Sequence, residues 1–281
     1  MIRKINVKTV TKAIKKLAID TNNNLCNDVC ERICEFAAKE TFPVAKDIMS
    51  GIQENISVAK QRNIPLCQDT GIVCIFMEIG QNVHFIGGNL EDAINEGVRQ
   101  GYKDGYLRKS VVNDPFERKN TDDNTPAVIN YKIVPGDKAI IKFAPKGFGS
   151  ENMSRIKMLP PAAGADAVKA FVVQVCQDAG ANPCPPTVVG VGIGGTFDSA
   201  ALMAKEALLE PLDADAQNDF YKVMEDELLN RINKLGIGPQ GFGGKTTALA
   251  VKIKAAPTHI AGLPVAVNIN CHVSRHGEII L

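Results

Sequence analysis

The chain has 281 residues and a formal net charge of +1, with 32 lysines and arginines against 31 aspartates and glutamates. Hydrophobic residues make up 45% and charged residues 22%, a globular composition that excludes a disordered, collagen-like or coiled-coil chain. Because positive and negative charges nearly cancel, the chain has no overall positive field that would attract nucleic acid or acidic lipid. The lack of tryptophan argues against a surface on which the bases of single-stranded nucleic acid stack.

The first 60 residues or so are predicted to be helical. Apolar residues fall on one face of a helix in the N-terminal segment, at Val10, Ala13, Ile14, Leu17 and Ala18. This segment lacks the apolar core of a secretory signal. No apolar run reaches the roughly 18 residues of a membrane helix. We therefore expect a cytoplasmic protein.

The rest of the chain mixes strand and helix patterns. The run 72–79, a turn at 80–82 and the run 83–88 predict one hairpin, and the runs 131–134 and 139–143 around Pro135-Gly136-Asp137 predict another. Further helices are expected at 91–106, 162–180, 198–210 and 215–234, and further strands at 187–193, 248–254 and 264–269. Because no linker-like stretch interrupts this order, we predict an α+β fold: a single mixed domain over residues 1–281, with a helical N-terminal region followed by mixed sheets with packed helices.

The eight cysteines fall into two groups. In a reducing compartment structural disulfides are rare, so metal binding, catalysis or burial are the alternatives. Five cysteines lie in helical or apolar segments and are predicted to be packing residues: Cys26, Cys30, Cys34, Cys74 and Cys176.

The other three cysteines, Cys67, Cys184 and Cys271, have polar, proline or glycine neighbours and are expected on loops. Three thiolates match an iron–sulfur cluster in which one iron has no protein ligand. Such an iron can act as a Lewis acid on a substrate hydroxyl or carboxylate. The alternative is a set of inert loop thiols.

Two glycine-rich segments offer a further interpretation. Residues 190–195, Gly-Val-Gly-Ile-Gly-Gly, fit the dinucleotide fingerprint, which makes an NAD-dependent oxidoreductase a remote alternative. The fit is weak because the acidic position about 20 residues on falls at a predicted helix end. Residues 241–246 fail as a phosphate loop, since Pro239 stands where the first glycine belongs. Either segment can bind an anion through main-chain N–H groups, or simply make tight turns.

Several polar residues are further candidates. Gln68 and Asp69 adjoin Cys67, so a donor, an acceptor and a thiol share one turn. Arg108 can hold a carboxylate through two hydrogen bonds, or be a solvated helix end. His259 lies beside a turn before the last predicted strand and can transfer protons, or serve as a structural hydrogen-bonding residue. His272, Arg275 and His276 crowd the region after Cys271.

Four motifs in order carry a resemblance to a known family. They are Cys67-Gln68-Asp69-Thr70-Gly71, then Lys146 to Asn152, then Cys184 followed by the segment 188–209, and finally GFGGKTTAL with KAAPTHIAGLPVAVNINCH. Together they resemble the alpha subunit of the two-subunit iron–sulfur hydro-lyases, class I fumarate hydratase and L(+)-tartrate dehydratase. The resemblance runs essentially from end to end.

The resemblance implies a cofactor, a set of site residues and a reaction. It implies a [4Fe–4S] cluster bound by Cys67, Cys184 and Cys271, with substrate contacts from Gln68, Arg108 and Gly149. It implies catalytic roles for Asp69 and His259. The reaction is a reversible addition of water to a dicarboxylate, with fumarate hydratase first and L(+)-tartrate dehydratase as the alternative. A non-catalytic cluster-carrying protein is a third class.

The resemblance also implies a partner. Single-chain relatives continue with a further domain, whereas this sequence has ten residues after Cys271. We therefore expect a separate beta subunit, and an alpha2beta2 heterotetramer by resemblance to the family.

Overall fold

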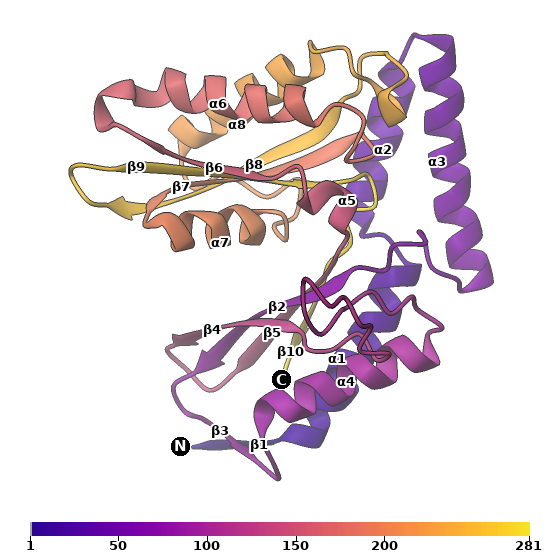
Figure 1. Ribbon diagram of the computed structural model, residues 1–281, viewed down its shortest axis with the longest axis vertical. Coiled ribbons are helices and arrows are strands. Elements are labelled where there is room, and N and C mark those ends of the chain that lie inside the picture. Colours follow the sequence, from indigo (N-terminus) through magenta and orange to yellow (C-terminus); the bar gives the residue numbers. More distant parts are fainter. Residues whose placement is uncertain (1) are drawn as a thin grey trace. The chain divides into compact units, whose positions relative to one another are not determined.

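The computed structural model describes residues 2–281 and has an α+β architecture, as predicted (Figure 1). The chain forms two compact units that interleave in the sequence. Unit 1 comprises the N-terminal segment through Cys26, Ile56–Phe148 and Arg275–Leu281, and unit 2 comprises Asn27–Asn55 and Gly149–Ser274. No single cut of the chain separates them, in keeping with the absence of a linker. The extent of one catalytic domain over residues 1–281 stays a prediction.

Unit 1 is built on a four-stranded mixed sheet with the order β10-β5-β2-β4. β2 is parallel to β4 and antiparallel to β5, and β10 adds antiparallel to β5 at the edge. A separate parallel pair joins β1 to β3. The elements are β1 (Arg3–Asn6), α1 (Val7–Asn23), β2 (Ile72–Gly80), β3 (Val83–Ile86), α4 (Leu90–Asp104), β4 (Val128–Val134), β5 (Ala139–Lys146) and β10 (Gly277–Ile280).

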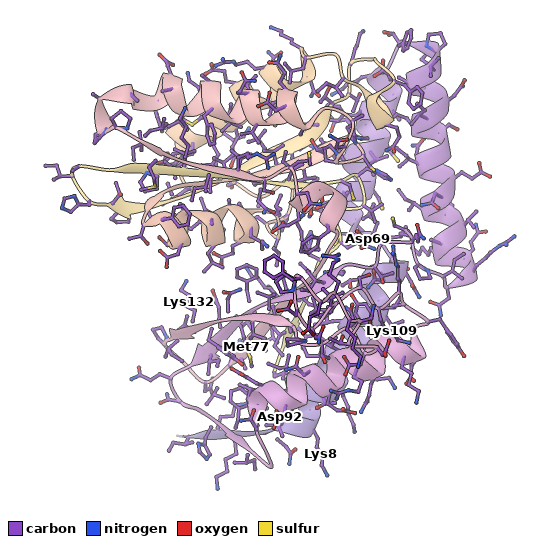
Figure 2. All side chains as sticks on the ribbon, viewed as in Figure 1. Lys8, Asp69, Met77, Asp92, Lys109 and Lys132 are labelled. Carbon is purple, nitrogen blue, oxygen red and sulfur yellow. The ribbon has the colours of Figure 1, made fainter. Side chains whose placement is uncertain are left out.

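Helices α1 and α4 cover this sheet and share its core. The predicted apolar stripe of α1 is buried, and Ile14 and Ala18 are fully enclosed. α4 approaches α1 closely because it carries glycines at the crossing: a Cβ on Gly97 would lie 2.7 Å from Ile14 Cβ, and one on Gly101 2.6 Å from Ala18 Cβ. The same core encloses Met77 of β2 (Figure 2).

Three details of the predicted secondary structure in unit 1 are wrong. Residues 3–6 form a strand rather than the start of a helix. β2 and β3 do not form a hairpin, because β3 pairs with β1. β4 and β5 do not pair with each other either, because β2 lies between them. The turn signals at 80–82 and 135–137 mark real chain reversals, yet the strands on either side take other partners.

Unit 2 is a three-layered arrangement around the mixed sheet β6-β9-β7-β8. β7 is parallel to β8 and antiparallel to β9. Figure 1 shows α6 and α8 over one face of this sheet and α7 over the other. Its elements are α2 (Asn27–Lys39), β6 (Arg155–Leu159), η1 (Pro161–Ala163), α6 (Gly164–Ala179), β7 (Thr187–Gly195), α7 (Phe197–Ala207), α8 (Asp219–Asn233), η2 (Pro239–Gly241), β8 (Ala248–Thr258) and β9 (Leu263–Asn270). Two further helices, α3 (Pro43–Arg62) and α5 (Phe148–Glu151), contain the boundaries between the units.

The glycines of the segment 190–195 serve helix packing on β7. A Cβ on Gly190 or on Gly192 would lie 2.1 Å from a main-chain oxygen of α7. α7 therefore lies directly on the strand backbone at these positions, and Gly190 and Gly192 belong to the strand rather than to a loop. Thr196 then begins α7 with a capping box completed by Ser199. No helix within residues 2–281 is long and apolar enough to cross a membrane.

Candidate functional site

Two of the three loop cysteines meet in unit 2. Cys184 lies just before β7 and Cys271 directly after β9, and the antiparallel pairing of these strands brings the two loops to the same end of the sheet. His272 fixes their relation, since its main-chain N–H donates to the Cys184 carbonyl at 3.4 Å and its ring Nδ1 lies 3.0 Å from the same oxygen. Cys184 is exposed and Cys271 half-buried.

Cys184 has a left-handed backbone conformation, with a φ of 53° that a residue other than glycine rarely adopts. Its N–H donates to Ala181 at 3.0 Å, and its carbonyl accepts from His272. Gln240 holds the next residue, because its main chain and its side-chain amide both donate to the Pro185 carbonyl at 2.8 Å. The thiol is thus presented by a loop that is fixed from several sides.

Gly149 adjoins this Cys184 loop. A Cβ built on Gly149 would have a single neighbour within 4 Å, the Asn182 carbonyl at 3.8 Å. Gly149 of the second motif and the Cys184 loop of the third motif therefore lie together in unit 2.

The third loop cysteine, Cys67, is half-buried in a loop of unit 1. Asp69 in the same loop is drawn in Figure 2. Its Oδ1 accepts from the Gly71 N–H at 2.9 Å and its Oδ2 from the Phe148 N–H at 3.0 Å. The Asp69 carboxylate thus joins the Cys67 loop to the glycine-containing loop that follows β5.

Arg108 is tied to the Cys67 loop through its backbone. The Thr70 hydroxyl donates to the Arg108 carbonyl at 2.9 Å, and the Arg108 side chain is exposed. Gln68 is exposed as well. Unit 1 therefore brings together Cys67, Gln68, Asp69 and the main chain of Arg108.

His259 is not brought to Cys184 and Cys271 within unit 2. It follows β8, whose Thr258 pairs with Gly195 at the end of β7, whereas Asn270 beside Cys271 pairs with Val188 at the start of β7. About 23 Å of strand separates these two ends of the sheet. His259 is exposed, and its Nδ1 accepts from the Ala261 N–H at 3.2 Å. Its catalytic role stays a prediction.

The remaining cysteines differ from the three loop cysteines in their surroundings. Cys74 and Cys176 are buried as predicted, and burial raises the pKa of the Cys176 thiol to about 12. The prediction of burial is wrong for Cys34, which is exposed on α2, and Cys26 and Cys30 are only half-buried. Cys34 Sγ accepts a hydrogen bond from the Gln53 amide at 3.2 Å.

The second glycine-rich segment binds an anion of the protein itself. The carboxylate of Glu40, 1% exposed, accepts from the Lys245 N–H at 2.8 Å and from the Thr246 hydroxyl at 3.3 Å. It also accepts from the Thr41 and Phe42 N–H groups. Burial alone would raise the pKa of Glu40, but these hydrogen bonds outweigh it and lower the pKa below its usual 4.5. Residues 241–246 therefore serve an internal carboxylate.

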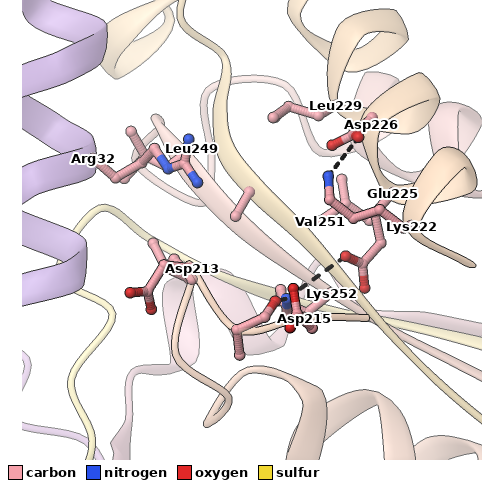
Figure 3. Close-up of a pocket in the computed structure, with 13 residues that line it drawn as sticks. Arg32, Asp213, Asp215, Lys222, Glu225, Asp226, Leu229, Leu249, Val251 and Lys252 are labelled. Atoms are coloured by element: carbon pink, nitrogen blue, oxygen red, sulfur yellow. Dashed lines mark hydrogen bonds and ion pairs between the residues drawn. The ribbon is translucent and has the colours of Figure 1, made fainter. Parts of the chain in front are cut away.

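A pocket of about 110 Å³ in unit 2 lies apart from the predicted site residues (Figure 3). α8, β8 and the segment 212–215 supply most of its lining. Its two buried charges are matched, because Lys252 Nζ lies 3.6 Å from Glu225 Oε2 and donates to the Ala214 carbonyl at 2.6 Å. Burial raises the pKa of Glu225, although the Ile253 N–H and Lys252 oppose that rise. None of the eight predicted site residues lines this pocket.

Comparison with known proteins identifies the family. The sequence matches the family model described as fumarate hydratase (fumerase) over residues 11–280. The chain belongs to the fumarate hydratase family. A chain of Methanocaldococcus jannaschii, provisionally named as the alpha subunit of L(+)-tartrate dehydratase, is 40% identical over 258 residues, covering 89% of this chain and 90% of the relative. The L(+)-tartrate dehydratase subunit alpha of Escherichia coli O157:H7 is 30% identical over 279 residues, covering 98% and 91%.

The donor set in this member of the fumarate hydratase family fits an iron–sulfur cluster. Cys184 is exposed and Cys67 and Cys271 are half-buried, whereas Cys74 and Cys176 are buried. Thiolates are the usual ligands of such clusters, and three of them leave one iron without a protein ligand. Of the other cysteines that are not buried, Cys30 and Cys34 lie on α2, and Cys26 lies directly before that helix.

Sequence reasoning missed the residues that hold these loops. His272 and Arg275 were expected only to crowd the region after Cys271, and Asn22, Thr70 and Gln240 were not singled out. Arg275 is 3% exposed and donates to Asn22 Oδ1 at 2.9 Å and to the Asp69 carbonyl at 2.7 Å. The one signal in the sequence for Arg275 was its position four residues after Cys271, a predicted cluster ligand.

Proposed function

We propose that the chain is the alpha subunit of an iron–sulfur hydro-lyase that adds water reversibly to fumarate to give L-malate. The observation that carries the proposal is that the loops of Cys184 and Cys271, joined through His272, lie at one end of the unit 2 sheet in a chain of the fumarate hydratase family. Cys67, presented by the motif that also carries Gln68 and Asp69, is the proposed third ligand.

The residues around these cysteines suit a dicarboxylate substrate. When bound, a [4Fe–4S] cluster supplies a Lewis acid for substrate oxygens. The exposed guanidinium of Arg108 can bind a carboxylate through two parallel hydrogen bonds, and Gln68 offers both a donor and an acceptor. Gly149 has room beside it, because a Cβ built there would meet only the Asn182 carbonyl within 4 Å.

Asp69 is the proposed proton carrier of the Cys67 loop. Hydration places a hydroxyl on one alkene carbon and a proton on the other, so the protein must handle one proton per turnover. Each Asp69 oxygen accepts one main-chain N–H, which fixes the carboxylate and leaves a lone pair on each oxygen for a proton. His259 is the second proposed proton-transfer residue.

A second candidate substrate is L(+)-tartrate, which dehydration converts to oxaloacetate. The observation in its favour is that the Methanocaldococcus jannaschii and Escherichia coli relatives carry the name of L(+)-tartrate dehydratase subunit alpha, provisionally in the first case. That name also supports a separate partner subunit for this chain, and the resemblance to the family implies a beta subunit in an alpha2beta2 assembly.

The cofactor is tested by measuring iron and acid-labile sulfide after anaerobic reconstitution of the full chain. We expect about four iron atoms per chain in the wild type and loss of the cluster in Cys67→Ser, Cys184→Ser and Cys271→Ser. Cys30→Ser is the matched control, since Cys30 lies on α2 outside the three loops. A cluster that persists in any of the three loop variants refutes the ligand assignment.

The substrate is tested on the chain co-expressed with its partner subunit. The ratio of kcat/KM for fumarate to that for L-tartrate decides between the two hydro-lyases. A cluster-containing complex without turnover of either substrate would instead favour a non-catalytic cluster-carrying protein.

A further inference from the structure

The loop from Leu66 to Gly71 contains three of the predicted site residues and no helix or strand of its own. Other parts of unit 1 must therefore fix its conformation. At its start the Leu66 N–H donates to the Asn22 carbonyl at 2.9 Å. At its end Gly71, with a φ of 76°, packs against the backbone of Lys146, where a Cβ would lie 2.7 Å from main-chain atoms.

A buried arginine closes the loop between these ends. Arg275 is 3% exposed, and its guanidinium donates from two nitrogens in different directions. Nη1 donates to Asn22 Oδ1 at 2.9 Å, and Nη2 donates to the Asp69 carbonyl at 2.7 Å. Both are hydrogen bonds from a charged donor, which are stronger than neutral ones.

These contacts form a closed ring of hydrogen bonds around two site residues. Asn22 binds Leu66 through its carbonyl and Arg275 through its side chain, and Arg275 binds the Asp69 carbonyl. Cys67 and Gln68 lie in the chain between the two anchored residues. The position of the Cys67 thiol is therefore set by where Arg275 holds Asp69 relative to α1.

We propose that Arg275 is a positioning residue for the hydro-lyase, which fixes Cys67 for cluster binding and Gln68 for the substrate; this rests on the proposed function. The planar guanidinium supplies two donors at a fixed angle, whereas a lysine ammonium can replace one bond at a time. A variant with lysine should therefore retain the buried charge and one bond, yet lose the ring.

The first readout is hydrogen–deuterium exchange in the full chain, which requires neither cofactor nor substrate. In Arg275→Gln the amides of Leu66 and Gly71 should exchange at least about tenfold faster, because a charge-assisted hydrogen bond is lost. In Arg275→Lys the same amides should exchange at an intermediate rate. This second variant keeps the test possible if Arg275→Gln fails to fold. The amides of β2 and β5 should keep their rates.

Arg3→Gln is the matched control. Arg3 is also in unit 1, and its Nη1 donates to the main-chain carbonyls of Asp137 and Leu281 at 3.1 Å, away from the Cys67 loop. This variant should leave the exchange of residues 66–71 and the iron content unchanged.

The second readout is function per bound cluster in the complex with the partner subunit. Arg275→Lys should raise KM several-fold and should lower kcat when kcat is calculated per iron-loaded enzyme. A role limited to folding would lower the loaded fraction alone. Wild-type loop exchange in both Arg275 variants, or a wild-type KM and wild-type kcat per iron-loaded enzyme, would overturn the positioning role. Failure of the wild-type chain to bind iron would instead overturn the proposed function, which the exchange measurement does not depend on.

Discussion

Replacing Gly192 by alanine tests the packing of α7 on β7. The added Cβ would lie 2.1 Å from the Ala200 carbonyl and 2.8 Å from the Ala204 nitrogen, both main-chain atoms of α7 that cannot rotate away. Restoring an ordinary contact requires a separation of the two backbones by about 1 Å, which forfeits a quarter to a half of the van der Waals attraction across the gap.

The expected cost lies at the upper end of the range for overpacking, about 3 kcal/mol. For a chain of this size that loss lowers the Tm by about 6–12 °C. The assay is thermal unfolding followed by circular dichroism, at one scan rate for all variants. Gly51→Ala is the control: Gly51 lies inside α3 with no atom within 4 Å of its Cβ position, so this variant should gain about 0.5–1 kcal/mol.

A Gly192→Ala variant that unfolds within a degree or two of the wild type would refute this reasoning. It would mean that α7 does not lie on the strand backbone, and it would reopen the interpretation of residues 190–195 as an anion-binding loop. A parallel loss of stability in Gly190→Ala, whose Cβ would lie 2.1 Å from the Ala204 carbonyl, would support the packing role for both glycines.

Three further predictions concern the loops. His272→Ala should weaken iron binding by about tenfold or more, because the Cys184 carbonyl loses the imidazole ring that contacts it. His272→Asn can place a side-chain donor near the same position and should retain most of the iron. Equal iron content in the two variants would contradict this prediction. Glu40→Gln should destabilise the chain by about 2 kcal/mol at pH 7, because an amide nitrogen would face donors. Since folding lowers the pKa of Glu40, its stabilisation is present above pH 4.5 and lost as the pH falls through the lowered folded-state value, so urea unfolding should give converging midpoints for the two proteins in acid. Gly149→Ala should keep the wild-type Tm, because the methyl group meets only the Asn182 carbonyl at 3.8 Å, but should raise KM for the dicarboxylate; an unchanged KM would remove Gly149 from the substrate site.

The local patterns of the sequence predict most elements and few of the pairings between them. Apolar periodicity places α6, α7, α8 and the strands β7, β8 and β9 correctly, because each buries one face or both. The hairpins fail for a physical reason: a turn reverses the chain, but β2 gains more by pairing with β4 on one side and β5 on the other. A short turn signal contains no information about that competition.

The same limit applies to the candidate site. The motifs indicate which loops are candidates for the site, through a cysteine, an acidic residue and a glycine at short spacing. The groups that hold those loops lie far away in the chain: His272 is 88 residues from Cys184, and Arg275 is 206 residues from Asp69. The glycine-rich segments show the converse, because close backbone approach and anion binding both favour glycine. Residues 190–195 and 241–246 are both rich in glycine, yet the first packs against α7 and the second binds the Glu40 carboxylate.

The interleaving of the two units sets an order for assembly during synthesis. A ribosome completes every residue of unit 2 when it reaches Ser274, but unit 1 then still lacks the strand β10 and Arg275. Until those residues emerge, β5 has an open edge and the Cys67 loop has no guanidinium at Asp69. The strands that place Cys184 and Cys271 are therefore complete in the nascent chain before the residue that holds the Cys67 loop has been added.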